Sequence, residues 1–168
     1  MSEEIVNKVA NSDLMTIDLS DYSPKRIIVE IDIKDFLFEG VILREKEFRM
    51  QLKEFDFSVF SNKIIAIYCS SDAIVPMWAF MLLSSYLSLI SYEFHYGKKE
   101  QVFQKLFLQN IQALETSKFN GKKVLVKGCG SINLLEENYI AISKKLLPVV
   151  SSLMFGEACS AVPIYKKT

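Results

Sequence analysis

The sequence predicts an α/β fold: a three-layer sandwich around a mostly parallel sheet with flavodoxin-like or Rossmann-like strand order. Three observations favour it. Half of the 168 residues are apolar, two strand-like runs lie near the N-terminus, and strand and helix patterns alternate from residue 62 onward. This length is typical of one domain. We therefore expect a single domain over 1–168, with N-terminal strands and helices in 1–60 and alternating strand–helix units in 61–168.

The N-terminal region begins with a helical pattern at 2–9 and continues with alternating apolar residues at 15–19 and 26–33. Alternation of this kind is typical of strands with one buried face. Because only a short turn at 21–24 separates the two strands, we expect an antiparallel pair at the edge of the sheet or packed across one end of it. A charged segment at 44–55 has a narrow apolar stripe and predicts a surface helix.

From residue 62 the pattern changes to regular alternation of strands and helices. Strands are expected at 63–69, 92–96, 122–127 and 152–155, and helices at 73–90, 98–115 and 134–150. Such alternation predicts parallel strands joined by right-handed helical crossovers. After the last strand we expect an extended tail held by Pro163. No internal repeat is visible in the sequence.

Composition excludes several classes of protein. The formal net charge is zero, so no global bias favours nucleic acid or an anionic membrane. The first residues lack the basic and apolar regions of a signal peptide. The longest apolar stretch, 73–90, is interrupted by Pro76 and several serines and predicts a buried helix rather than a membrane span. An odd number of cysteines without a signal peptide favours the reducing cytoplasm.

Each of the three cysteines lies at the end of a predicted strand or shortly after it: Cys69, Cys129 and Cys159. Ligands bind beyond the carboxyl ends of the strands in open α/β sheets. Neighbouring strands lie about 4.8 Å apart, so in a flavodoxin-like order the outer two cysteine Cα atoms would be roughly 10 Å apart. We therefore expect the three thiols to share one site at this edge of the sheet.

Other candidate residues lie in the same predicted loops. Gly128 and Gly130 flank Cys129 and would let a ligand approach the backbone closely. Asp72 follows Cys69 and is a candidate cap of the next helix. His95, the only histidine, is a candidate ligand or base, although a lone histidine is more often structural.

Three functions remain open on these residues. Three thiolates, with Asp72 or His95 as a further donor, suit zinc or an iron–sulfur cluster. Alternatively, Cys69 or Cys129 is the reactive thiol of an enzyme or redox protein, because a helix N-terminus or a glycine-rich turn favours a thiolate. Asp72, His95 or Glu157 would then assist the chemistry. The third alternative is a non-catalytic interaction module, for which Trp78 would have to face solvent.

Four stretches of the chain, 4–12, 71–79, 127–130 and 155–166, are similar to a bacterial family of proteins of unknown function. The resemblance spans nearly the whole chain. The family has cysteines at the positions of Cys69, Cys129 and Cys159 and is associated with gene neighbourhoods of the SUF-type iron–sulfur assembly machinery. The resemblance therefore implies an accessory role with iron–sulfur assembly proteins as partners.

Overall fold

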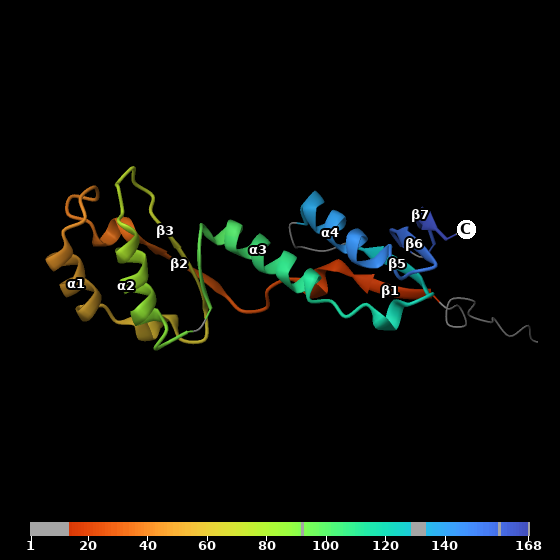
Figure 1. The fold of residues 1–168 in the computed structure, drawn as a ribbon, viewed down its shortest axis with the longest axis horizontal. Helices are drawn as coiled ribbons and strands as arrows, with labels where there is room; N and C mark the ends of the chain where they lie inside the picture. Colours follow the sequence, from red (N-terminus) through yellow and green to blue (C-terminus); the bar gives the residue numbers. More distant parts are fainter. Residues whose placement is uncertain (1–13, 92, 129–133, 158, 168) are drawn as a thin grey trace, which may run out of the picture. The chain divides into compact units, whose positions relative to one another are not determined.

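The computed structural model describes residues 14–91, 93–128, 134–157 and 159–167, and the predicted helix at 2–9 lies outside them. The chain divides into two compact units (Figure 1). The inserted unit is Pro24–Lys105, and the split unit combines Met1–Ser23 with Leu106–Thr168. The single domain over 1–168 stays a prediction.

The sheet of the inserted unit consists of three parallel strands in the order β2-β3-β4. Their bounds are β2 (Ile28–Asp32), β3 (Ile64–Tyr68) and β4 (Phe94–Tyr96). The central strand β3 is buried from Ile64 to Ile67. A continuous apolar run of this kind is typical of a parallel strand that is covered on both faces.

The core of the inserted unit lies between this sheet and two helices. They are α1 (Glu45–Glu54) and α2 (Met77–Leu87), with short 3-10 helices at η2 (Ile33–Phe36) and η3 (Phe57–Phe60). Figure 1 shows α1 and α2 side by side next to β2 and β3. Phe48 and Leu52 of α1 are fully buried, as are Leu83 and Leu87 of α2. Their helical spacing places each pair on one face, and burying each such side chain contributes about 1.5–3 kcal/mol.

The split unit has a four-stranded sheet in the order β1-β5-β6-β7. Its elements are β1 (Leu14–Asp18), η1 (Leu19–Tyr22), η4 (Ser117–Phe119), β5 (Lys123–Lys127), α4 (Glu136–Leu146), β6 (Ser152–Phe155) and β7 (Val162–Lys166). The first three strands of this order are parallel, and β7 pairs antiparallel with β6. Helix α3 (Lys99–Gln112) begins in the inserted unit and ends in the split unit.

The α/β class and the mostly parallel pairing are confirmed, but the predicted antiparallel pair of N-terminal strands is wrong. β1 pairs with β5 and β2 pairs with β3, both in parallel. The physical reason is burial, because β3 and β5 are buried strands that each need a neighbour on both sides. A short turn between two strands does not outweigh that requirement. The three-layer arrangement stays a prediction.

The expected extended tail is the strand β7, with Pro163 inside it. Proline lacks a backbone N–H and is therefore confined in sheets to edge strands or bulges. β7 is the edge strand of its sheet, and its pairing with β6 is irregular at Leu153 and Met154. The proline is thus compatible with a strand at this place.

The two units repeat one topology, although the sequence analysis found no internal repeat. In each, a strand and a 3-10 helix are followed by a helix, a second 3-10 helix and a β–α–β motif. The first strand of that motif, β3 or β5, is the central strand in β2-β3-β4 and in β1-β5-β6. The inserted unit interrupts the split unit after Ser23. One copy of the topology is therefore nested within the other.

The repetition also holds residue by residue. From α1 to β4, the same difference in residue number separates each residue of the inserted unit from the equivalent residue of the split unit. We call residues at matched positions counterparts. They include Ile31 and Ile17, Asp32 and Asp18, Phe48 and Phe107, Leu52 and Ile111, Phe60 and Phe119, Leu87 and Leu146, and Gly97 and Gly156. The strand registers match as well, since Ile28 is opposite Ile64 in one unit and Leu14 is opposite Lys123 in the other.

Special backbone positions also recur. Asn62 and its counterpart Gly121 both have positive φ, of 59° and 68°. The amide of Gly97 donates to the Ile67 carbonyl at 2.8 Å, and that of Gly156 donates to the Val126 carbonyl at 3.0 Å. Each unit is therefore an internal control for the other: a feature present in both serves the fold, and a feature present in one needs another explanation.

Candidate ligand pocket

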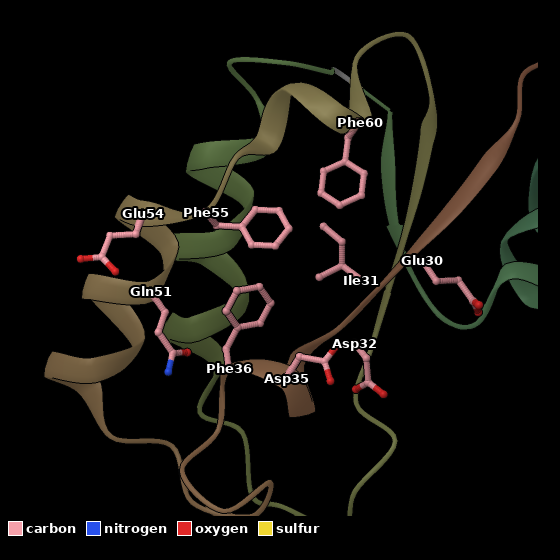
Figure 2. A pocket seen from close by; sticks show the side chains of 9 residues that line it. All are labelled: Glu30, Ile31, Asp32, Asp35, Phe36, Gln51, Glu54, Phe55 and Phe60. Carbon is pink, nitrogen blue, oxygen red and sulfur yellow. The ribbon is translucent and has the colours of Figure 1, made fainter.

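A pocket of about 390 Å³ lies beside β2 in the inserted unit. Its lining residues come from β2, η2, α1 and η3 and the residue that follows α1: Glu30, Ile31, Asp32, Asp35, Phe36, Gln51, Glu54, Phe55 and Phe60. Figure 2 shows the rings of Phe36 and Phe55 turned toward Ile31, with Asp32 and Asp35 where β2 runs into η2. The pocket thus has an apolar floor and acidic residues around its edge.

The carboxylates of the pocket are close enough to influence one neighbouring hydroxyl. The pKa of Tyr68, at the end of β3, is raised by desolvation and by the charges of Asp32, Glu30 and Asp35. The charges of these three residues therefore act on a common region at the carboxyl end of the sheet. Lys98 provides a cation nearby, with Nζ 5.9 Å from the centre of the Tyr68 ring.

Asp32 is fixed by hydrogen bonds from two segments. Its Oδ1 accepts from the amide of Lys34 at 3.0 Å and from the amide of Ser70 at 3.0 Å. Partial desolvation acts to raise the pKa of Asp32, but the bonds from Ser70 and Lys34, with the Lys34 charge, lower it on balance. The carboxylate is therefore ionised at neutral pH and ties the loop after β3 to η2.

The floor of the pocket is aromatic. The ring centres of Phe36 and Phe55 are 5.5 Å apart, and Phe55 stacks on Phe60 at 5.8 Å. On the α1 side, the carbonyl oxygen Oε1 of Gln51 is buried and has no hydrogen-bond partner among the described residues. A buried acceptor without a donor costs about 1–3 kcal/mol, so it requires an explanation.

The split unit shows which of these features the fold itself needs. Asp18, the counterpart of Asp32, also caps its 3-10 helix, with Oδ1 accepting from the Ser20 amide at 3.0 Å. Thr16 and Ala113 stand where the inserted unit has Glu30 and Glu54. The capping aspartate is therefore structural, whereas the two glutamates belong to the inserted unit alone.

The side-chain amides of Gln51 and of its counterpart Asn110 differ in their hydrogen bonds. Asn110 donates from Nδ2 to the Tyr22 carbonyl at 2.8 Å and thereby ties its helix to η1. Gln51 has one more methylene, and its oxygen has no described donor. Glu30 also has a structural contact, because its Oε1 accepts from the Lys99 amide at 2.9 Å. The unpartnered oxygen of Gln51 is therefore the polar feature of this pocket that the shared topology does not explain.

The predicted cysteine site does not form on one sheet. Cys69 follows β3 of the inserted unit, and Cys159 follows β6 of the split unit. Cys129 and Gly130 lie outside the described residues. The expectation that the three cysteine-bearing strands are contiguous is therefore wrong, because β3 pairs with β2 and β4 and only β5 and β6 are neighbours.

The environments of the two described thiols differ. Cys69 is partly buried, and its Sγ lies 3.6 Å from the Ser71 carbonyl and 3.4 Å from the Ser71 hydroxyl. Cys159 is exposed. No three His, Cys, Asp or Glu side chains among the described residues are grouped so as to hold a metal ion. The thiol-enzyme alternative stays a prediction.

The remaining predicted site residues have structural surroundings. Asp72 is exposed and is not a helix cap, because α2 begins at Met77 with Pro76 at the N-cap position. Burial and the charge of Lys105 lower the pKa of His95, whose Nε2 lacks a described partner. Trp78 packs edge-on against Phe48, with ring centres 5.9 Å apart, so it belongs to the core rather than to an exposed patch.

Gly128 is explained by packing rather than by a ligand. A Cβ atom at this position would collide with the hydroxyl of Tyr139 and with the Leu134 side chain. Tyr139 also donates from its hydroxyl to the Gly128 carbonyl at 3.5 Å. The close approach that a glycine permits is made here by the tyrosine. Glu157 is exposed.

A family model described as a protein of unknown function (DUF2480) matches residues 3–167. The chain belongs to the DUF2480 family. No curated protein and no solved structure matches it. None of the described helices is both long and apolar enough to cross a membrane.

Sequence reasoning missed the pocket of this DUF2480 protein, although a signal was present. The pattern Ile-Asp-x-x-Asp-aromatic occurs at 17–22 and again at 31–36. Aligning these two segments would have exposed the repeat and, with it, the unmatched Glu30. Gln51 and Glu54 could not be assigned to the pocket from sequence, because their proximity to β2 depends on how α1 packs.

Proposed function

We propose that the protein is a binding protein whose pocket in the inserted unit takes an organic cation, a guanidinium or primary ammonium group on an apolar stem. The observation that supports this most is the buried, unpartnered Oε1 of Gln51 in a pocket edged by carboxylates. Only a donor can satisfy that oxygen. The sequence had indicated a site at the carboxyl ends of strands, and this pocket adjoins the end of β2.

The chemistry of the lining favours N–H donors that carry positive charge. Glu30, Asp32, Asp35 and Glu54 are acceptors when ionised, and Gln51 presents its carbonyl oxygen. Hydrogen bonds between ionised partners are roughly twice as strong as neutral ones. A guanidinium group has five N–H donors and no acceptor, so it complements this lining.

The aromatic floor favours an organic cation over a metal ion. Metal ions such as Mg²⁺ and Ca²⁺ need several oxygen atoms converging on one point. The described acidic side chains are not grouped in this way. The faces of Phe36, Phe55 and Phe60 can instead contact an alkyl stem and attract a cation, a contribution of about 0.5–2 kcal/mol.

Calorimetric titration of the full chain with propylguanidinium tests this proposal. Propylurea, a neutral molecule of nearly the same shape, is the matched ligand control. We expect binding of propylguanidinium only, and the affinity should fall at least about tenfold in Asp35→Asn, since one charge-assisted contact is worth about 1.5–3 kcal/mol.

The split unit provides the matched protein control. Asp21 is the counterpart of Asp35 in η1, so Asp21→Asn makes the same chemical change outside the pocket. Its affinity for propylguanidinium should equal that of the unchanged protein. Equal binding of propylguanidinium and propylurea, or equal losses in the two variants, would contradict the proposal.

A metal- or cluster-binding accessory role is the second candidate. It is supported by the pairing of β5 with β6, because neighbouring parallel strands direct the segments after them to one edge of the sheet. Cys129 and Cys159 are in those segments. Two thiolates suit zinc or an iron–sulfur cluster and leave positions for donors from an iron–sulfur assembly partner. Reduced thiols imply a cytoplasmic protein.

Metal analysis after anaerobic purification tests this second candidate. We expect iron or zinc in the unchanged protein, its loss in Cys129→Ser and in Cys159→Ser, and its retention in Cys69→Ser. Cys69 is the matched control because its strand belongs to the other sheet. Metal content that is equally low in all four proteins would eliminate this candidate.

A further inference from the structure

The outer edge of β4 has no partner strand among the described residues. Its counterpart β6 differs in this respect, because β7 pairs antiparallel with it from Ser152 to Phe155. The two units are otherwise alike in strand order and register. Within the described part of the chain, the inserted unit therefore lacks a strand that its counterpart has.

The backbone of β4 is ready for such pairing. The Glu93 carbonyl accepts from the Ile65 amide at 3.0 Å, and the Gly97 amide donates to the Ile67 carbonyl at 2.8 Å. Alternate residues of a parallel strand turn their polar groups toward the same neighbour. Those of Phe94 and Tyr96 consequently point away from β3, toward the open edge.

The split unit identifies what these two residues are suited for. Their counterparts Leu153 and Phe155 pair with Tyr165 and Val162 of β7. An exposed strand edge of this kind is a template for another chain, and natural proteins usually protect it. At β4, Tyr96 is 72% exposed and no charged residue lies within the strand.

Helix α2 adds an exposed apolar surface beside this edge. α2 contains no charged residue, whereas its counterpart α4 has four: Glu136, Glu137, Lys144 and Lys145. Met77 and Met81 are 73% and 72% exposed. They line a pocket of about 670 Å³ together with Phe80 and Tyr96. A helix without a polar face normally packs against something on each side.

The equivalent surface in the split unit is partly covered. Tyr139 and Phe155 make an edge-on contact at 5.6 Å, as Phe80 and Tyr96 do at 5.7 Å. In the split unit, Ile164 of β7 lines the pocket beside this pair. An antiparallel strand is thus what the shared topology places next to such a pair.

We propose that a second copy of this chain occupies the edge, with β4 pairing antiparallel to β4 of the partner about His95. The edge is self-complementary, because Phe94 of each copy then lies opposite Tyr96 of the other and each pair can exchange two backbone hydrogen bonds. Antiparallel pairing is also the orientation of β7 on β6. The exposed methionines of α2 extend the contact beyond the short strand.

Sedimentation velocity over a range of micromolar concentrations tests this inference. The chain has a mass of 19.2 kDa, and we expect a species of twice that mass. Tyr96→Pro removes one outward N–H without touching the bonds to β3, and Tyr96→Lys places a charge opposite Phe94. Both variants should be monomers with an unchanged circular dichroism spectrum.

Leu89→Lys is the matched control, because Leu89 is an exposed apolar residue that does not line the pocket beside β4. This variant should remain a dimer. Hydrogen exchange adds a direct reading: the amides of Phe94 and Tyr96 should be protected in the dimer and exposed in Tyr96→Lys. A monomeric unchanged protein, or a dimer that persists in folded Tyr96→Lys with both amides unprotected, would overturn the inference.

Discussion

Asp32 shows how one side chain serves both the fold and the pocket. It caps η2 through the Lys34 amide and holds the loop after β3 through the Ser70 amide. Asp18 makes the equivalent cap through the Ser20 amide. The capping role could be predicted from the Asp-x-x-Asp pattern, but the contact with Ser70 could not, because it depends on β2 lying next to β3.

Replacing Asp32 by Ala should therefore destabilise the protein by about 1–2 kcal/mol, the usual value of a lost cap. Asp18→Ala should destabilise the protein by a similar amount, because Oδ1 of Asp18 makes the equivalent cap on η1. The folded-state pKa of Asp32 lies below the usual 3.8. Its contribution is therefore present above pH 3.8 and lost as the pH falls through the folded pKa. Urea unfolding at neutral and acidic pH measures both effects, and equal losses at both pH values would contradict the assignment.

Gly128 makes a second prediction at the scale of one residue. Gly128→Ala should destabilise the split unit by about 1–3 kcal/mol, because the added methyl group overlaps Tyr139 and Leu134. Tyr139→Phe removes the nearest overlapping atom, so the double variant should regain part of the loss. Thermal unfolding of both variants checks this. Full stability of Gly128→Ala would show that Tyr139 does not pack against this glycine.

At the scale of elements, the turns before β3 and β5 make the repetition testable. Asn62 has φ of 59° where Gly121 has 68°. Asn62→Gly should be nearly neutral, whereas Asn62→Ala should cost about 1 kcal/mol, because alanine disfavours left-handed backbone. Chemical denaturation distinguishes the two variants. A larger loss for Asn62→Gly than for Asn62→Ala would contradict the equivalence of the turns.

The sequence predicted most elements but not their partners. The apolar run at 63–69 and the helical pattern at 134–150 are local signals, and β3 and α4 lie within these predicted ranges. The prediction of strand pairing failed because β1 and β2 have the same apolar alternation and differ only in which buried strand each one joins. The start of α2 moved from Ala73 to Met77 because Pro76 lies outside the helix as its N-cap.

The pocket was even harder to predict from the sequence than the pairing of the strands. Its lining combines β2, η2, α1 and η3, which are distant in the sequence and meet only through the core around Phe48 and Leu52. The cysteine positions predicted a site because cysteine is rare and reactive. Neither composition nor residue spacing indicates that the Gln51 oxygen is unpartnered, so this feature is visible only in the structure.

At the scale of the whole molecule, the nested arrangement predicts two separate cores. Phe48 and its counterpart Phe107 are both fully buried. Truncating either to alanine should cost about 3–5 kcal/mol. In hydrogen exchange, Phe48→Ala should raise exchange mainly within 24–105, and Phe107→Ala mainly within 14–23 and 106–167. Uniformly raised exchange in both variants would show that the two cores are one cooperative unit.

We propose a cation pocket in the inserted unit that its counterpart lacks. Nuclear magnetic resonance of the side-chain amides during titration with propylguanidinium tests it most directly. We expect the Gln51 amide resonances to shift saturably and those of Asn110 to stay unchanged, and we expect propylurea to have no effect. Unchanged Gln51 resonances, or equal shifts of Gln51 and Asn110, would contradict it.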